Sequence, residues 1–526
     1  MPASPSTARA INDRLALRLL QQEGPLTAGQ LKQLTGLSRP TVADLVERLT
    51  AAGLIAVVGE AGEQRRGPNA KVYGIVADRA HLAALDVRTE GVAVAVADLV
   101  GRVLAEASVP IGGDTGTGPA VEQAVTLVER VAKEAGADRL HTVGIGAPGL
   151  IDPSSGELRD STGLPEWHRR LVATLQDRLP EARVSVENET NLAALAEQRD
   201  GAARDRDTFV LLWLGHGTGA AVVLDGALRR GASGGTGEIG FLPVPGTNAL
   251  PTSTDCEGGF HSLASAAAVV DLAVACGVPV VAGQEPSVVG VVRAAAAVMR
   301  EAVDRVGRVP GAVPSGRMAD VVAGAVPSDR MPDVVAGAVP PGRVPEVAPG
   351  AVPSDRVPEV APGAVPSDRV PEVAPGAVPP GRMPEVAPGA VPSDRVPEVV
   401  AGAVPSEQMP EVAPGAASPW GDSAPAAARF LDALADRLAV GVASVVAILD
   451  PGCVVLGGEV GQAGGEELAS RVQDRIARMT PLPTEVRATT LGGGAVLRGA
   501  LLTARDRAQE ELFTPGEPPP QPSPGW

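Results

Sequence analysis

The chain has 526 residues, a formal net charge of −17, 44% hydrophobic residues and only 2% aromatic residues, which gives room for several domains with cores of Ala, Val and Leu. No apolar run approaches the roughly eighteen residues of a membrane span, and the N-terminus lacks the apolar core of a signal peptide. Cys256, Cys276 and Cys453 lie too far apart for a CxxC metal pair or a disulfide framework, so we expect a cytoplasmic protein without a membrane partner.

The first eighty residues predict a small helical module. They hold ten Lys and Arg against seven Asp and Glu, a local charge of +3 that leaves −20 for the rest and favours a polyanionic partner. The apolar spacing predicts a helix over Ile11–Gln22, a second over Ala28–Leu34 capped by Thr27, and a third capped by Ser38 with Pro40 in its first turn. Two such helices joined by a short glycine-containing turn form the helix-turn-helix pattern.

Two predicted strands complete this module as a winged helix-turn-helix. Leu54–Val58 and Lys71–Ile75 flank the segment Gly59–Ala70, which corresponds to the wing. In such modules the first residues of the second helix of the motif reach base edges in the major groove of double-stranded DNA. The alternative is a three-helix protein-interaction module with ordinary surface arginines. We predict DNA contacts by four residues at or within the third helix: Ser38, Arg39, Thr41 and Arg48.

Further along, Val184–Phe241 predicts a pocket for a polyol. Sugar hydroxyls both donate and accept hydrogen bonds, so a buried sugar site needs carboxylates and amides. Asn188 and Glu189 follow a short strand, and Glu238 lies in a glycine-rich segment. Ligands of open α/β sheets bind where strands end, so we predict that Asn188, Glu189 and Glu238 contact a sugar. The alternative is that each is an ordinary surface turn residue.

Four motifs identify the chain as similar to the ROK family of repressors, open reading frames and kinases. The resemblance covers Leu82 to about Arg507, apart from an insert, and implies a two-lobed, actin-like (ribonuclease H-like) α/β domain. It also implies that Arg65 and Arg66, in the wing, enter the minor groove of DNA. The motifs are Val143-Gly-Ile-Gly-Ala-Pro-Gly149, Glu187-Asn-Glu-Thr-Asn-Leu-Ala-Ala-Leu-Ala-Glu197, Gly231-Ala-Ser-Gly-Gly-Thr-Gly-Glu-Ile-Gly240 and Leu449-Asp-Pro-Gly-Cys-Val-Val-Leu-Gly-Gly458.

The chain departs from the pattern of ROK kinases at two places. Their first turn is Asp-x-Gly-Gly-Thr, whose glycines admit the phosphates of ATP, whereas this chain has Asp86-Val-Arg-Thr-Glu90. Their catalytic pair is Asn-Asp, whereas this chain has Asn188-Glu189, and a misplacement of about 1 Å can cost around a hundredfold in rate. We therefore expect no enzyme activity and no ATP; Glu189 is the catalytic residue if the chain is a kinase.

The resemblance also bears on zinc and on a fourth sugar contact. Family members bind zinc through a His after Gly-Glu-Ile-Gly and three close cysteines, but here Phe241 replaces that His and Cys256 stands alone, so we expect no zinc. His261 occupies the position of a sugar-binding Glu and is predicted to contact the sugar; the alternative is a structural histidine. Gly215–Gly219 and Gly457-Gly458 resemble the family's nucleotide loops, although glycines also serve tight turns.

A proline-rich repeat interrupts the predicted ROK domain. From Gly311 to Pro414 a 13-residue unit recurs eight times, and its prolines exclude helix and central strand, which predicts disorder. Lengthening a connection from about ten to about a hundred residues costs only about 2 kcal/mol of closure entropy, so the fold tolerates the insert. We predict a winged helix-turn-helix at 1–77, the ROK domain at 78–306 and 416–512, the disordered insert at 307–415 and a proline-rich tail at 513–526.

The sequence is compatible with three functions. The first is a transcriptional repressor, a homodimer or dimer of dimers that binds double-stranded DNA and responds to a sugar or sugar phosphate. The second is an ATP-dependent sugar kinase with a fused helix-turn-helix domain. The third is a scaffold whose proline repeats dock into aromatic-lined grooves of a partner. The departures from the kinase pattern favour the first.

Overall fold

The computed structural model describes residues 5–61, 70–159, 164–247, 249–280, 288–307 and 424–513. All of them belong to one compact unit, formed by Met1–Arg317 and Ala417–Trp526. The proline-rich repeats, the wing arginines Arg65 and Arg66, and the tail lie outside the described residues, so the expectations about them stay predictions.

The N-terminal module has the predicted winged helix arrangement. Thr27 and Gln30 form a capping box at the start of α2, and the Ser38 hydroxyl accepts a hydrogen bond from the Thr41 amide at the start of α3. The turn between the two helices needs a residue in the left-handed region, which Gly36 supplies with φ of 69°. The elements are α1 (Pro5–Glu23), β1 (Leu26–Thr27), α2 (Ala28–Thr35), α3 (Arg39–Ala51), β2 (Ile55–Ala61) and β3 (Ala70–Ile75), with strand order β1-β3-β2.

The first lobe is built on a five-stranded sheet with strand order β6-β5-β4-β7-β8. β4, β5 and β6 form an antiparallel meander, and β7 and β8 run parallel to β4. After the short helix η1 (Ala77–Arg79), the elements are β4 (His81–Arg88), β5 (Gly91–Asp98), β6 (Val103–Pro110), α4 (Thr117–Glu134), β7 (Leu140–Ala147), α5 (Glu166–Arg178), β8 (Arg183–Asn188) and α6 (Glu189–Asp200).

The second lobe repeats this topology, with strand order β11-β10-β9-β12-β13. β9, β10 and β11 form an antiparallel meander, and β12 and β13 run parallel to β9. The elements are β9 (Phe209–Leu214), β10 (Thr218–Leu224), β11 (Ala227–Arg229), η2 (Ile239–Phe241), α7 (His261–Ala264), α8 (Ala266–Ala275), α9 (Val288–Gly307), α10 (Ala424–Leu449), β12 (Cys453–Gly457), α11 (Gly458–Met479), β13 (Glu485–Ala488), η3 (Gly492–Gly494) and α12 (Ala495–Leu512).

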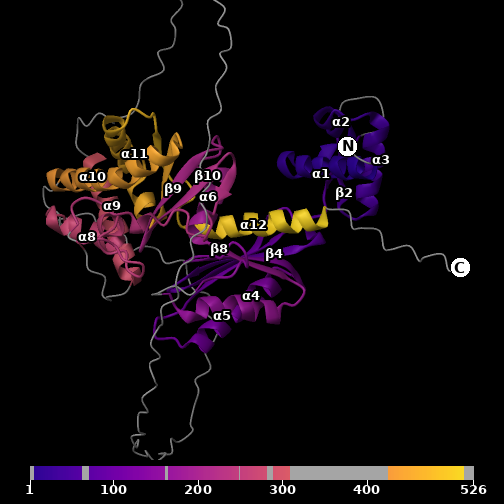
Figure 1. The fold of residues 1–526 in the computed structure, drawn as a ribbon. Helices are drawn as coiled ribbons and strands as arrows, with labels where there is room; N and C mark the ends of the chain where they lie inside the picture. The colour runs from indigo at the N-terminus through magenta and orange to yellow at the C-terminus, as the bar shows by residue number, and fades with distance from the viewer. Residues whose placement is uncertain are drawn as a thin grey trace, which may run out of the picture. The chain divides into compact units, whose positions relative to one another are not determined.

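The helices cover the sheets in a way that places α6 and α12 between the lobes (Figure 1). α4 and α5 pack on the outer face of the first sheet, and α8 to α11 pack on the outer face of the second. The inner faces of both sheets contribute to one buried cluster that includes Leu192 of α6 and Val496 and Ala500 of α12. Two mixed sheets with helices on both faces are the actin-like arrangement that the sequence predicts.

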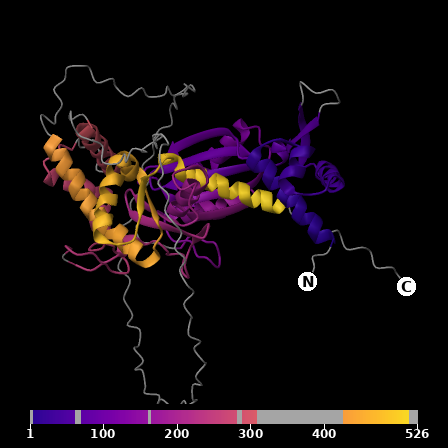
Figure 2. The ribbon, with the colours of Figure 1, turned by 90° about the horizontal axis from the view of Figure 1, so that it is seen from above.

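The C-terminal helix α12 also reaches the winged helix module. Both ribbon views show its C-terminal end beside α1 (Figures 1 and 2). The Gln509 side-chain amide donates to the Gln21 side chain at 2.8 Å and to the Leu99 carbonyl at 2.9 Å, and Gln21 donates to the Val100 carbonyl at 3.1 Å. Leu17 of α1 is fully buried in the same cluster as Leu99. α12 therefore touches the interior of the two lobes at one end and α1 at the other.

Candidate functional site

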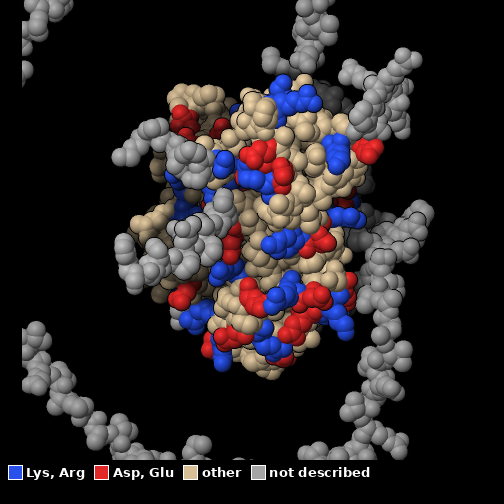
Figure 3. All heavy atoms as spheres, turned by 90° about the vertical axis from the view of Figure 1, so that its right-hand side faces the viewer, with Lys and Arg blue, Asp and Glu red and all other residues tan. Residues whose placement is uncertain are grey.

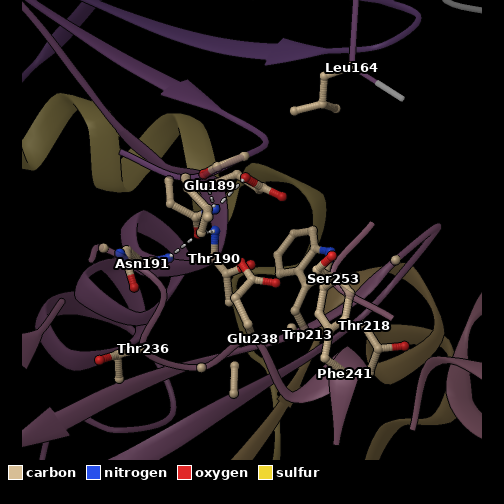
Figure 4. A pocket seen from close by; sticks show the side chains of 18 of the residues that line it. Leu164, Glu189, Thr190, Asn191, Trp213, Thr218, Thr236, Glu238, Phe241 and Ser253 are labelled. Atoms are coloured by element: carbon tan, nitrogen blue, oxygen red, sulfur yellow. Dashed lines mark hydrogen bonds between the residues drawn. The ribbon is translucent and has the colours of Figure 1, made fainter. Parts of the chain in front are cut away.

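A polar cavity of about 580 Å³ lies where the loops of the two sheets meet. Its volume is in the range of small-molecule sites, and its wall contains Asn188, Glu189 and Glu238, three of the predicted sugar contacts. Figure 4 shows Glu189, Trp213 and Glu238 around the middle of the cavity. The wall also includes Leu164, Thr190, Asn191, Thr218, Thr236, Phe241, Ser253 and Thr254.

Asn188 has a structural role at the edge of this cavity. Its side-chain oxygen caps α6 by accepting from the Thr190 amide at 2.9 Å and the Asn191 amide at 3.2 Å. Its side-chain nitrogen donates to the Gly149 carbonyl at 3.0 Å and to the Glu189 carboxyl at 3.1 Å. Asn188 therefore fixes the direction of Glu189 and joins α6 to the loop after β7; its predicted contact with sugar stays a prediction.

Glu189 is the first residue of α6 and projects into the cavity. Burial raises the pKa of its carboxyl from 4.5 to about 8. Near neutral pH the group is therefore protonated, and its hydroxyl donates while its carbonyl oxygen accepts. That pair of roles matches the hydroxyl and the ring or carbonyl oxygens of a sugar.

Glu238 is held by a backbone turn that only glycine allows. Gly237 has φ of 90°, and a β-carbon at this position would collide with the carbonyl oxygen of Ala220. The Gly237 carbonyl in turn accepts from the Ala220 amide at 2.7 Å. This turn ties the loop to β10 and presents Glu238 to the cavity, which explains the glycine-rich segment of the sequence.

A buried network behind α6 was not found from the sequence. Glu187 is 9% exposed and accepts from the Asn191 side chain at 3.0 Å, from its neighbour's amide at 3.0 Å and from Arg230 at 2.6 Å. The network joins β8 and α6 of one lobe to the segment after β11 of the other. Glu187 stands inside a recognised motif, but Arg230 lies 43 positions away and only the fold brings it close.

His261 is not among the residues that line the two cavities that contain Glu189. It begins the short helix α7 and is half-buried, and burial lowers its pKa. Phe241, which stands at the predicted zinc-ligand position, lines the larger cavity instead. In the part of the chain that the structure describes, no group of three or more His, Cys, Asp and Glu side chains is placed to hold a metal. The expectation that zinc is absent stays a prediction, as does the sugar contact of His261.

The four described DNA-contact candidates lie on or before α3. Arg39 is exposed in the first turn, and Ser38 and Thr41 are joined by a hydrogen bond of 2.8 Å between their hydroxyls. Arg48 instead points back into the module, where it pairs with Asp13 of α1 at 2.6 Å and with Asp44. Its guanidinium is thus occupied by two carboxylates, which leaves Arg39 as the exposed cation at the start of the helix. Figure 3 shows basic and acidic side chains intermixed on that side of the molecule.

Comparison with known proteins identifies the main body of the chain. The ROK family model matches residues 82–274 and 418–507. The chain belongs to the ROK family. A model of the MarR family matches residues 11–67 of this ROK protein, which cover most of the winged helix module. These matches confirm the family resemblance and the predicted order of a winged helix and an actin-like domain.

The curated relatives of this ROK protein include regulators and a kinase. It is 27% identical over 244 residues to the DNA-binding transcriptional dual regulator NagC of Escherichia coli K12, covering 45% of this chain and 58% of the relative. The Xylose repressor of Caldicellulosiruptor bescii is 25% identical over 240 residues, with 45% and 59% covered. The Glucokinase of Thermotoga maritima is 32% identical over 143 residues, with 27% and 45% covered. The match thus spans less than two thirds of each relative.

A solved structure supports the fold over nearly the whole chain. A ROK family transcriptional regulator described as a homolog of the Escherichia coli MLC protein aligns with a TM-score of 0.60 and 17% identity, covering 96% of this chain and 98% of its own. At that identity the likeness shows the fold alone. None of the described helices is long and apolar enough to cross a membrane.

Proposed function

We propose that this ROK protein is a transcriptional repressor that binds double-stranded DNA through its winged helix module and responds to a sugar in the cavity that contains Glu189. The main support is that α12 contacts both the cavity-bearing lobes and the winged helix module. This helix packs against α6, the helix that begins with Glu189, and its Gln509 bonds to Gln21 of α1. A ligand that favours one arrangement of the lobes therefore has a physical route to the DNA-binding module.

The DNA contact we propose is centred on the first turn of α3. Arg39 is exposed there, and an arginine in that position can donate two hydrogen bonds to guanine. Ser38 and Thr41 stand beside it, and Arg65 and Arg66 of the wing are proposed to enter the minor groove. Two copies in a homodimer, or in a dimer of dimers, would bind half-sites about one helical turn apart in the cytoplasm.

A sugar kinase is the second candidate, because the Thermotoga maritima relative is named a glucokinase. Two features weigh against this function. A base must be ionised to accept a proton from a hydroxyl, but burial raises the pKa of Glu189 to about 8. Arg88 and Thr89 also place side chains in the turn after β4, where the kinases of the family have glycines. We propose that the chain has no kinase activity and uses neither ATP nor zinc.

The test is fluorescence anisotropy of the full chain on the duplex upstream of its own gene, repeated with a panel of sugars and without ATP. We expect sequence-specific binding that one sugar changes. Equal affinity for the upstream duplex and a scrambled duplex at physiological salt would overturn the proposal. Sugar-dependent ATP hydrolysis that disappears in Glu189→Ala would establish the kinase instead.

A second measurement tests the proposed route through α12. Gln509→Ala removes the side chain that bonds to Gln21 and Leu99 but leaves the cavity wall intact. We expect sugar affinity to stay unchanged while the effect of sugar on DNA affinity falls by about fivefold. Arg507→Ala, elsewhere on the same helix, is the matched control.

A further inference from the structure

A second, smaller cavity of about 250 Å³ adjoins the larger one. The two share four wall residues, Leu164, Glu189, Trp213 and Gly217, so a ligand in the larger cavity lies next to the smaller one. Its remaining wall includes the end of β4 and the β4–β5 turn of the first lobe and Glu459 at the start of α11 in the second lobe, together with Pro148, His216, Val292 and Val496. The smaller cavity is therefore where the two lobes face each other beside Glu189.

Arg88, the last residue of β4, spans this region. Its guanidinium donates to the Asp86 carboxylate at 3.0 Å, to the Glu459 carboxylate at 2.7 Å and to the Gly493 carbonyl at 3.4 Å. Asp86 is on the same strand, whereas Glu459 is in the first turn of α11 and Gly493 precedes α12. One side chain of the first lobe thus holds two segments that follow strands of the second.

The surroundings fix Arg88 in this position. Asp86 is only 5% exposed, and its burial raises its pKa against the opposing effect of Arg88. Burial lowers the pKa of Arg88 itself, but Asp86 and Glu459 outweigh that effect and raise it, so the guanidinium stays charged. A ring nitrogen of buried His168 lies 3.3 Å from the Arg88 carbonyl and anchors the backbone at the same point.

The charges of this wall are mostly negative. Four carboxyl groups line the smaller cavity, and three of them carry charge near neutral pH because Glu189 is protonated, while Arg88 is the single Lys or Arg side chain among the residues of its wall and is already paired with two of the charged groups. A phosphate group entering here would have to draw Arg88 away from its partners, which would leave Asp86 buried without its counter-ion. The carboxyl groups belong to Asp86, Glu90, Glu189 and Glu459.

We propose that Arg88 ties the two lobes together across the smaller cavity, and that this ion-paired wall makes the site select an unphosphorylated sugar over phosphate-bearing ligands. The second half of this inference rests on the proposed sugar response and narrows its ligand class. The first half concerns the protein alone. Arg88 acts as a positioning and specificity-determining residue. It holds Glu459 and the segment before α12 against the first lobe, beside Glu189, which lines both cavities.

Hydrogen exchange of the full chain without ligand tests the tie. Glu459→Ala removes the carboxylate by which the second lobe binds Arg88. The Arg88–Asp86 pair remains, so the buried carboxylate of Asp86 keeps its counter-ion. We expect amides in the β4–β5 turn, in the first turn of α11 and at residues 491–497 to exchange at least about threefold faster, with α4 unchanged. Glu466→Ala, an exposed carboxylate of the same helix, is the matched control and should exchange as the unaltered chain does.

Equal exchange in Glu459→Ala and the unaltered chain would overturn the tie, as would the same acceleration in the control. Arg88→Lys is a second variant, because a lysine keeps the charge but bonds from a single point and cannot hold all three partners. We expect it to accelerate exchange at the start of α11 and at residues 491–497. Since no ligand is involved, this result stands whether or not the chain is a sugar-responsive repressor.

The preference for an unphosphorylated ligand is tested with inorganic phosphate, a non-hydrolysable ATP analogue, and sugars compared with their phosphate esters. We expect millimolar phosphate and the ATP analogue to leave exchange around the smaller cavity unchanged; protection of the β4–β5 turn by either would overturn the selection.

Calorimetry then compares glucose and N-acetylglucosamine with their 6-phosphates. Where a sugar binds, its phosphate ester should bind at least about tenfold more weakly, and equal or tighter binding of the ester would also overturn it. If no sugar of the panel binds, the proposed effector response fails, while the exchange results still decide the tie and the exclusion of phosphate.

Discussion

The protonation state of the Glu189 carboxyl in the larger cavity can be tested through the pH dependence of the free energy of unfolding. Burial raises the pKa of this carboxyl from 4.5 to about 8, which corresponds to about 5 kcal/mol at about 1.4 kcal/mol per pH unit. That figure is an upper bound, because the carboxyl faces an open cavity where solvent screens the charge. We expect about 2 kcal/mol to be measurable. Glu189→Gln replaces the protonated acid with a neutral group of similar shape.

The sign of the pH dependence follows from the direction of the shift. Between about pH 4.5 and about pH 8 the folded chain keeps a proton on Glu189 that the unfolded chain has lost, so the free energy of unfolding falls as pH rises through this window and then levels off. The Glu189→Gln variant lacks this contribution. Its stability relative to the unaltered chain should therefore increase by about 2 kcal/mol from about pH 5 to about pH 9.

Urea denaturation followed by tryptophan fluorescence measures this difference, since Trp213 lines the same cavity. Glu466→Gln, at an exposed position of α11, serves as the control and should keep a constant difference from the unaltered chain. A constant difference for Glu189→Gln as well would refute the assignment of a protonated carboxyl to the cavity.

Three further predictions concern single side chains. Arg39→Ala should weaken specific DNA binding by about 1–3 kcal/mol in anisotropy titrations, and unchanged affinity would remove the first turn of α3 from the interface. Arg48→Ala leaves Asp13 without its partner at 2.6 Å, so the winged helix module should lose about 1–2 kcal/mol in denaturation while an Asp13→Asn/Arg48→Ala double variant recovers part of it. Gly237→Ala places a β-carbon against the Ala220 carbonyl, so calorimetry should find sugar binding lost; binding within about twofold of the unaltered chain would show that the turn yields.

Local chemistry explains which parts of the fold the sequence predicts well. The Ser38 cap, the Pro40 of the first turn and the apolar spacing that follows define α3 within a few residues, and the structure places that helix at Arg39–Ala51. The three short Val-, Ala- and Leu-rich runs between Leu82 and Leu104, broken at 88–91 and 98–101, likewise predict the β4–β5–β6 meander. These signals depend on neighbours in the chain, so one sequence is sufficient to find them.

Side-chain pairing between distant segments could not be predicted in this way. Arg88 and Glu459 are 371 positions apart, and nothing local to either residue indicates the other. The sequence suggested only that side chains fill the turn after β4; the structure adds that one of them joins the lobes. Arg48 is a similar case, because its helical position fits a DNA-backbone contact but the packing of α1 brings Asp13 to its guanidinium.

The residues of the candidate sugar site also differ in how well the sequence predicts their position. Asn188, Glu189 and Glu238 were predicted from their motifs and lie together in one cavity wall. His261 is predicted by resemblance alone; it begins α7 and is not among the residues that line that wall, and its sugar contact stays a prediction.

Under the proposed function, sugar binding and DNA binding are coupled within one chain. The most direct measurement is the dissociation constant for the upstream duplex with and without saturating sugar, together with that for the sugar with and without saturating duplex. Coupling through the protein requires both to change by the same factor, for which we expect about fivefold to about a hundredfold. Specific DNA binding with a factor of one in both directions would show that the two sites are not coupled.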